Sequence, residues 1–166
     1  MDIQFTPVVT LKQTKELAKV AEKIYYDYYV SLIGKENVDY MLEEYKSANS
    51  VIDQIKSRKH NYYDIYCDGV FCGYFDIMFE GRRVILDKIY VSKEYRRRGI
   101  ARYVIEHIEK LIKPIGINKI IVDILIKNQA ACQAYERLGF VKLKEGVITL
   151  GNGFKADYAE MEKKVK

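Results

Sequence analysis

The chain has 166 residues, of which 49% are hydrophobic and 31% are charged, and its net charge at pH 7 is +5. This composition is typical of a globular domain and excludes fibrous or membrane-spanning classes, since no apolar run approaches the roughly 20 residues of a membrane helix. The three cysteines lack metal-ligand spacing and the N-terminus lacks a basic segment before an apolar stretch, so we expect a cytoplasmic protein without disulfides, metal, signal peptide or membrane contact.

The first third of the chain predicts a strand followed by helices. Residues 3–10 read as a strand, and Thr14 is predicted to cap one long amphipathic helix that reaches Leu32 and stops at Gly34. Two shorter helices are expected next. The first carries Val38, Met41, Leu42 and Tyr45 on one apolar stripe, and the second covers residues 51–57. This part of the sequence therefore predicts a helical layer that precedes most of the strands.

From residue 60 onward the period changes to that of strands. Alternating side chains and two turn signals predict strands over residues 62–67, 71–79 and 84–91. They are followed by a helix over residues 100–115, an aliphatic strand over 120–126, a helix capped by Asn128 and a closing hairpin over 141–165. We therefore predict a single domain over residues 1–166 with a mixed α/β (α+β) fold.

A helix connects the strand over 84–91 to the strand over 120–126, so these two strands are expected to be parallel neighbours. The other strands are joined by short turns and are expected to be antiparallel. The predicted architecture is a mostly antiparallel sheet of about seven strands with a central parallel pair, flanked by helices. Ligands tend to bind beyond the C-terminal ends of parallel strands, which directs attention to the segment after residue 91.

The sequence YRRRGIA at residues 95–101 lies at such a strand end and opens the next helix. The first N–H groups of a helix lack intrahelical partners, and the helix dipole adds about half a positive charge there. Gly99 and the small Ala101 let a ligand approach the backbone closely. Forked donors and further charge come from Arg96, Arg97 and Arg98. Together these features predict a cradle for a diphosphate.

Two other phosphate-binding motifs do not fit this basic turn. It is not a P-loop, because no Gly-Lys-Ser/Thr follows, and it lacks the three spaced glycines of the dinucleotide fingerprint. Nucleic acid is not expected as a partner, because Glu94, Glu106 and Glu109 interrupt the basic cluster. A solvated basic turn without a ligand stays open as the structural alternative.

Two motifs together resemble the GNAT-type N-acetyltransferase family. Residues 96–101, RRRGIA, match the family's Arg/Gln-x-x-Gly-x-Gly/Ala turn, and residues 128–140, NQAACQAYERLGF, match its Asn-x-x-Ala-x-x-x-Tyr-x-x-x-Gly-Phe. The preceding strand LDKIYV resembles the family's central cofactor strand. The resemblance is strong over residues 84–140, whereas the first third of the chain matches only in layout. It implies acetyl-CoA as the acetyl donor and no metal.

The resemblance implies which residues bind acetyl-CoA. The diphosphate would lie on the turn formed by Arg96, Arg97, Arg98, Gly99, Ile100 and Ala101. The pantetheine amides would pair with backbone groups of Ile89, Tyr90 and Val91, where the two parallel strands splay apart. Asn128 would contact the pantetheine arm, and it is also expected to be a helix N-cap, since the two roles can coexist.

The resemblance also implies an acid and a base. Tyr135 would protonate the departing thiolate, for which a phenol with a pKa near 10 is a suitable acid, although it could instead be a core tyrosine. Asp87 is the candidate base, because it shares a strand face with aliphatic residues that would raise its pKa; a structural hydrogen bond is the alternative, and Asp123 is a second candidate. Cys132 is expected to be a helical filler, because no histidine is placed to activate it.

The predicted function is an acetyl-CoA-dependent N-acetyltransferase that moves an acetyl group to a primary amine by direct attack in a ternary complex. The acceptor, a small-molecule or peptide amine, is not identified by the residues. A non-catalytic acyl-CoA-binding or sensor domain on the same fold is the alternative, and a nucleic-acid-binding module is a more remote one. Dimers are common in the family, so a homodimer is an expectation of the resemblance.

Overall fold

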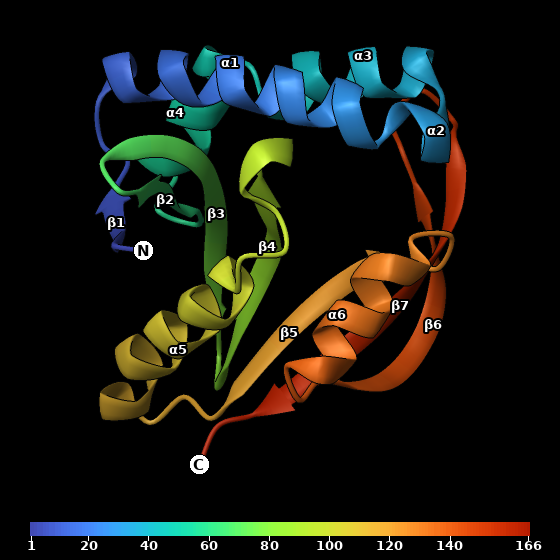
Figure 1. Ribbon diagram of the computed structural model, residues 1–166. Helices are drawn as coiled ribbons and strands as arrows, with labels where there is room; N and C mark the ends of the chain where they lie inside the picture. Colours follow the sequence, from blue (N-terminus) through green and yellow to red (C-terminus); the bar gives the residue numbers. More distant parts are fainter. The chain divides into compact units, whose positions relative to one another are not determined.

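The computed structural model describes residues 1–166, except for the side chain of Lys88. The strands are β1 (Ile3–Pro7), β2 (Asn61–Cys67), β3 (Val70–Glu80), β4 (Arg83–Val91), β5 (Lys119–Leu125), β6 (Val141–Thr149) and β7 (Lys155–Lys164) (Figure 1). The helices are α1 (Leu11–Tyr28), α2 (Val30–Ile33), α3 (Lys35–Tyr45), α4 (Ala48–Lys56), α5 (Ile100–Ile112) and α6 (Gln129–Arg137). Short 3-10 helices cover Lys93–Tyr95 and Lys113–Ile115.

The strands form a 7-stranded sheet in the order β1-β2-β3-β4-β5-β7-β6. β4 and β5 are parallel, with Val84 opposite Ile120 and Ile85 opposite Ile121. The pairs β1–β2, β2–β3, β5–β7 and β6–β7 are antiparallel. The helix α5 lies in the connection between the two parallel strands, as such a crossover requires. The predicted mixed fold with one parallel pair is therefore confirmed.

The chain groups into two compact units, and the first consists of Met1–Ile77 with Ile89–Ile100. In this unit α1 contacts both α3 and α4 (Figure 1). Leu17, Ala21 and Ile24 of α1 are buried at helical spacing, so the helix turns one apolar stripe toward the core. The single domain over residues 1–166 stays a prediction.

The start of α1 differs from the sequence prediction. Thr10, not Thr14, is the N-cap: its side chain accepts a hydrogen bond from the N–H of Gln13, and the Gln13 side chain accepts from the N–H of Thr10. This reciprocal capping box satisfies two helix-end donors. Thr14 lies inside the helix, fully buried, and donates to the carbonyl of Leu11.

The end of the long predicted helix also differs. The sequence predicts one helix to Leu32, but α1 ends at Tyr28 and the separate α2 begins at Val30. Tyr29 between them is buried, and its ring lies 6.4 Å from that of Tyr90 on β4, so packing against another element interrupts a pattern that is continuous in the sequence. Gly34, with φ +84°, ends α2 as expected, because a left-handed residue suits glycine.

The second unit consists of Met78–Lys88 with Ala101–Lys166. Ile120, Val122 and Ile124 of β5 are at most 1% exposed, and β5 lies between β4 and β7 in the sheet. α6 lies against β5 (Figure 1). Its first turn is capped by Asn128, which accepts from the N–H of Ala131 at 3.2 Å, as predicted.

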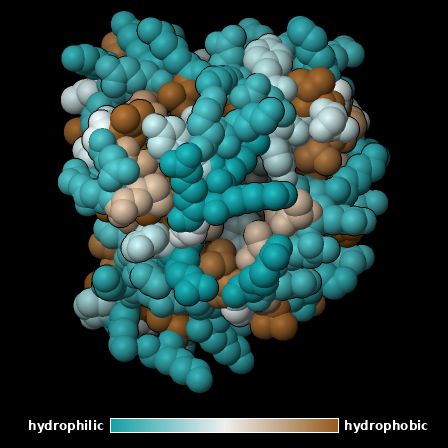
Figure 2. Space-filling model, in the orientation of Figure 1, coloured by the Kyte–Doolittle hydropathy of each residue, from teal (hydrophilic) through white to brown (hydrophobic). Residues whose placement is uncertain are grey.

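Hydrophilic side chains dominate the face of the molecule drawn in Figure 2, and hydrophobic residues gather there only in small separate groups. Such isolated exposed apolar side chains are normal for a globular surface. In the part of the chain that the structure describes, no helix combines the length and the apolar character that crossing a membrane requires.

Candidate active site

The candidate diphosphate turn lies where β4 gives way to α5. Arg97 and Gly99 both have left-handed backbone, with φ of +62° and +78°. Arg97, Arg98 and Gly99 are exposed, and a Cβ at Gly99 would meet no heavy atom within 4 Å. A left-handed arginine costs about 1 kcal/mol or more, and such strain concentrates at functional sites.

The geometry of this turn fits an anion. α5 begins at Ile100, so the N–H groups of its first turn, from Ile100 and Ala101 onward, have no intrahelical acceptor. No acidic residue occupies that first turn. The positive end of the helix dipole and the exposed guanidinium groups of Arg97 and Arg98 point to a negatively charged ligand with several oxygen atoms. A diphosphate, as coenzyme A carries, has this chemistry.

Arg96 is oriented differently from the two arginines that follow it. Its Nε donates to the carbonyl oxygen of Val91 at 2.9 Å, and its guanidinium carbon lies 5.0 Å from the centre of the Tyr28 ring. Arg98 stacks on Tyr95 at 5.3 Å but stays exposed. The three consecutive arginines therefore do not form one equivalent set.

The end of β4 is held close to β3. The carbonyl oxygen of Tyr90 lies so near Gly73 that a Cβ at residue 73 would be 2.1 Å from it. One residue beyond β4, the N–H of Ser92 donates to the carbonyl of Cys72 at 2.8 Å. Gly73 is therefore needed for the close approach of the two backbones, and the Tyr90 carbonyl faces β3.

The side chain of Tyr90 belongs to a buried tyrosine cluster. Its hydroxyl is 3.1 Å from the Tyr25 hydroxyl, and its ring stacks on Tyr74 with 4.8 Å between centroids. The Tyr29 ring lies 4.9 Å from Tyr25. Tyr25 and Tyr29 are thus the two tyrosines of α1 and its C-cap that turn inward, whereas Tyr26 is exposed and hydrogen-bonds Asp39.

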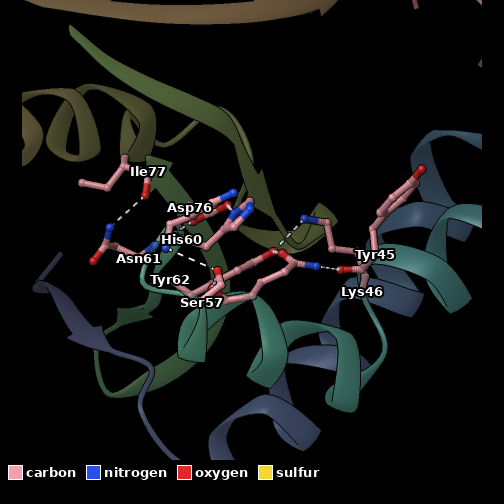
Figure 3. A network of polar contacts seen from close by, with 10 residues as sticks. Tyr45, Lys46, Ser57, His60, Asn61, Tyr62, Asp76 and Ile77 are labelled. Atoms are coloured by element: carbon pink, nitrogen blue, oxygen red, sulfur yellow. Dashed lines mark hydrogen bonds and ion pairs between the residues drawn. The ribbon is translucent and has the colours of Figure 1, made fainter. Parts of the chain in front are cut away.

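A buried lysine adjoins this cluster, and sequence reasoning missed it. Lys46 is 5% exposed; its Nζ donates to the Tyr62 hydroxyl at 3.0 Å and lies 5.8 Å from the centre of the Tyr90 ring. The Tyr62 hydroxyl in turn donates to Gln54 at 2.6 Å (Figure 3). The cost of burying the Lys46 ammonium group is offset by the aromatic rings beside it and by the hydrogen bond to the Tyr62 hydroxyl.

A second polar group lies in the same region of β2 and β3 (Figure 3). The fully buried carboxylate of Asp76 lies 2.5 Å from Nδ1 of His60 and accepts from the backbone N–H of Asn61 at 3.1 Å. Asp64, two residues from Tyr62 on β2, is also fully buried. The only signal in the sequence that these two acids are buried is that each lies within a strand of mostly apolar residues.

The second unit contains the predicted acid and base. Tyr135 on α6 is 7% exposed, and its ring meets Phe140 edge-on with 5.2 Å between centroids. Asp87 on β4 is half-buried. Asp123 on β5 is exposed and lies opposite Glu160 of β7. The proposed roles of these residues stay predictions.

Cys132 follows Asn128 by one helical turn on α6. Its sulfur lies 3.9 Å from the carbonyl of Leu125, and burial, helped by the carboxylate of Glu136, raises the pKa of the thiol. A raised pKa keeps the thiol protonated and poorly nucleophilic, in line with its expected role as a helical filler. Among the described residues, no group of three or more His, Cys, Asp and Glu is arranged to hold a metal ion.

The candidate residues divide between the two compact units. The first unit brings together the end of β4 and the turn, with Ile89, Tyr90, Val91, Arg96, Arg97, Arg98, Gly99 and Ile100. The second unit holds Asp87, Ala101, Asn128 and Tyr135. Within the second unit, the register of β4 and β5 pairs Arg83–Ile85 with Lys119–Ile121, which is the N-terminal part of both strands.

Comparisons with known proteins agree with this architecture. A PaiA N-acetyltransferase from Thermoplasma acidophilum, solved in complex with coenzyme A, superposes with a TM-score of 0.82 at 20% identity over 99% of both chains. A chimera of the spermidine N-acetyltransferase SpeG from Vibrio cholerae and hSSAT superposes with a TM-score of 0.70 at 15% identity, over 99% of this chain and 96% of that one. Identities this low establish a common fold.

Sequence comparison gives the family. An aminoglycoside N(6')-acetyltransferase type 1 from Acinetobacter genomosp. 13 is 34% identical over 55 residues, which are 33% of this chain and only 38% of that protein. The family described as "Acetyltransferase (GNAT) family" has a model that matches residues 20–140 of this chain. This range contains β4, the turn, α5, β5 and α6. Since the match covers most of the chain and both predicted motifs, the protein belongs to the acetyltransferase (GNAT) family.

Proposed function

We propose that the protein is an acetyl-CoA-dependent N-acetyltransferase that acts on a primary amine by direct attack in a ternary complex. The observation that carries the proposal is the open, left-handed turn at Arg97 and Gly99. It begins α5, whose first N–H groups have no intrahelical acceptor, beside exposed arginines. Membership of the family adds the acetyl group as the transferred group.

The coenzyme is proposed to lie on the first turn of α5 and on the end of β4. Its diphosphate would accept hydrogen bonds from the N–H groups at Gly99, Ile100 and Ala101, with charge supplied by Arg97 and Arg98. Its pantetheine amides would use backbone groups of residues 89–91. The Tyr90 and Val91 carbonyls already face Gly73 and Arg96, so the Ile89 carbonyl and the strand's N–H groups are proposed for this role.

The chemistry needs three proton movements: one from the protonated amine, one from the nitrogen as it becomes an amide, and one to the departing thiolate. Most aliphatic amines are protonated at neutral pH, so a proton must leave before the nitrogen attacks the thioester carbon; Asp87 is proposed to accept it, directly or through water. The amine nitrogen forms a new C–N bond with the thioester carbon, and the C–S bond breaks. Tyr135 is proposed to protonate the departing thiolate, and the second proton, which the nitrogen loses as it becomes an amide nitrogen, restores the Tyr135 phenol through solvent. Bound coenzyme supplies the activated acetyl group.

Direct transfer is preferred to an acetyl-enzyme on Cys132. That thiol is part-buried with a raised pKa, and it donates toward a backbone carbonyl instead of pairing with a base. A nucleophilic cysteine needs an environment that lowers its pKa and a base that takes its proton. The proposed route therefore passes from thioester to amine in one chemical step.

The acceptor is proposed only as a class, a small-molecule or peptide primary amine. One sequence relative is named an aminoglycoside acetyltransferase, and one structural relative is named a spermidine acetyltransferase. Both names refer to the relatives and do not identify the acceptor of this chain. We also propose a cytoplasmic location and a homodimer.

Two measurements test the proposal. Coenzyme A should raise the melting temperature of the protein, whereas NAD and ATP should not, because neither carries the pantetheine arm. A panel of amines should then show acetyl-CoA-dependent thiol release with an equal amount of acetylated product. A shift with coenzyme A but no product with any amine would instead favour a non-catalytic acyl-CoA sensor. Equal shifts with all three nucleotides would reject both functions.

A further inference from the structure

Arg96 is the first of three arginines in the turn, yet its contacts are with the protein. Its Nε donates to the carbonyl oxygen of Val91 at 2.9 Å in a part-buried setting. Val91 is the last residue of β4, so this bond closes the five-residue segment from the strand end back onto itself. The Nε atom is therefore already committed to the backbone and is not available to a phosphate.

The flat face of the same guanidinium is also in use. The central carbon of Arg96 lies 5.0 Å from the centre of the Tyr28 ring, at the end of α1. Arginine stacked on a tyrosine face gains about 0.5–1 kcal/mol or more, and its planar shape matters for this contact in a way that lysine cannot reproduce. Arg96 thus joins α1 to the end of β4.

A second contact ties the same segment to α1. Glu94, two residues before Arg96, forms an ion pair with Lys23 of α1 at 3.0 Å. Both partners are more than half exposed, so this pair contributes little by itself. With the part-buried Arg96 contact, however, it fixes residues 94–96 against the helix at two points.

The connection reaches the tyrosine cluster. The Tyr28 ring meets Tyr29 edge-on at 5.2 Å, and Tyr29 lies 6.4 Å from Tyr90, the residue before Val91. Tyr28, Tyr29, Tyr90 and Val91 thus form a chain of neighbours. Arg96 contacts the first through its ring and the last through its carbonyl oxygen. The position of the β4 end relative to α1 is fixed by both.

We infer that Arg96 is a positioning residue that sets the end of β4 against α1, and that Arg97, Arg98 and the first amides of α5 bind the diphosphate without it. The inference rests on the proposed function, since it assigns to the β4 end the task of aligning the pantetheine arm. A misplacement of a bound thioester by about 1 Å can lower turnover on the order of a hundredfold.

The test compares two acetyl donors. S-acetylpantetheine carries the thioester and the pantetheine amides but no diphosphate, whereas acetyl-CoA carries all three. Arg96→Met, which keeps the aliphatic stem and loses the donor and the planar cation, should lower kcat about tenfold or more with both donors and change the Kd for coenzyme A less than about threefold. Arg96→Lys should behave like Arg96→Met, because the charge is not the operative feature.

Arg97→Ala and Arg98→Ala are the matched controls. Each should raise the Kd for coenzyme A by about tenfold, more at low than at high salt, and should lower kcat/KM for acetyl-CoA far more than kcat/KM for S-acetylpantetheine. If Arg96→Met follows this second pattern, Arg96 is a phosphate ligand and the inference is wrong. It is also wrong if Arg96→Lys keeps the wild-type kcat.

Two further readouts separate the inference from simple destabilisation and from failure of the proposed function. Amide hydrogen exchange at residues 89–92 should increase in Arg96→Met while the melting temperature stays within a few degrees of wild type. A large loss of melting temperature with unchanged kcat per folded molecule would make Arg96 structural only. Wild-type protein that binds coenzyme A but transfers acetyl from neither donor would reject the proposed function, and the exchange result would still decide whether Arg96 holds the strand end.

Discussion

The carboxyl group of Asp64 should make the stability of this protein depend on pH. Asp64 is fully buried in β2, opposite Thr6 of β1 and Tyr74 of β3. Neither of its carboxyl oxygens has a hydrogen-bond partner among the described residues. Burial, with a smaller contribution from the carboxylate of Glu16, raises the pKa of Asp64 from 3.8 to about 7. The change that tests this is Asp64→Asn, which mimics the protonated form.

The size of the effect follows from the two pKa values. Each pH unit between 3.8 and about 7 corresponds to about 1.4 kcal/mol, so ionisation of Asp64 in the folded state costs about 4 kcal/mol in total. Because the folded protein holds this proton more tightly than the unfolded chain, the free energy of unfolding falls as the pH rises from about 4 to about 7. Above that range the contribution is constant, and below it the penalty is absent.

The assay is urea denaturation of wild type and Asp64→Asn at about pH 4.5 and about pH 8. The advantage of the variant over wild type should be about 3 kcal/mol larger at the higher pH. Asp53→Asn, a change at an exposed acid of α4, controls for the loss of one charge. If the difference between wild type and Asp64→Asn is the same at both pH values, Asp64 has a partner or is ionised throughout, and the reasoning fails.

Three further results are expected. Tyr135→Phe should lower kcat in steady-state assays about tenfold to a hundredfold, whereas calorimetry should show the Kd for coenzyme A changed less than about threefold. An unchanged kcat would mean that Tyr135 is not the acid. Gly73→Ala should lower the free energy of unfolding by about 2–3 kcal/mol, because its Cβ would lie 2.1 Å from the Tyr90 carbonyl oxygen. Gly69→Ala, which has open space around it, should lower the free energy of unfolding by only about 1 kcal/mol. Equal losses in urea denaturation would contradict the close approach of the backbones at Gly73. Cys132→Ala should keep the wild-type kcat for acetyl transfer, and inactivity of the folded variant would indicate an acetyl-enzyme instead.

The elements with local signals were predictable from the sequence. α6 has a capping asparagine at residue 128 and Gly139 after its end, and the structure shows both, with φ +95° at Gly139. The aliphatic run of β5 predicts burial on both faces. One face is buried at Ile120, Val122 and Ile124, but the other is buried only at Ile121, since Asp123 is exposed. Turn chemistry and helix caps depend on a few neighbouring residues, so such elements can be read without knowledge of the rest of the fold.

The beginning of α1 also has a local signal, but the predicted start is wrong. Thr10 and Gln13 form the Thr-x-x-Gln capping box, yet the apolar stripe that begins at Leu17 drew the predicted start to Thr14. The break at Tyr29 has a different cause. It comes from packing of Tyr29 on rings of other elements, including Tyr90, and no local pattern reports contacts between residues far apart in the chain.

The buried polar groups could not be predicted from periodicity. Alternation in β3 marked Phe75 and Ile77 as one buried face, but the strand is buried on both faces from Cys72 to Ile77, which encloses Asp76 as well. Whether a second face is covered depends on where helices pack. Lys46 is buried for the same reason, since a lysine at a helix end is usually exposed and only tertiary contacts with Tyr62 and Tyr90 enclose it.

The central claim is that coenzyme A binds with its diphosphate on the amides that open α5. A crystal structure of the protein with coenzyme A tests this most directly. The account predicts diphosphate oxygens within hydrogen-bond distance of the N–H groups of Gly99, Ile100 or Ala101, with Arg96 still bonded to the Val91 carbonyl. A coenzyme bound elsewhere, or a turn whose N–H groups are all bonded to protein atoms, would contradict it.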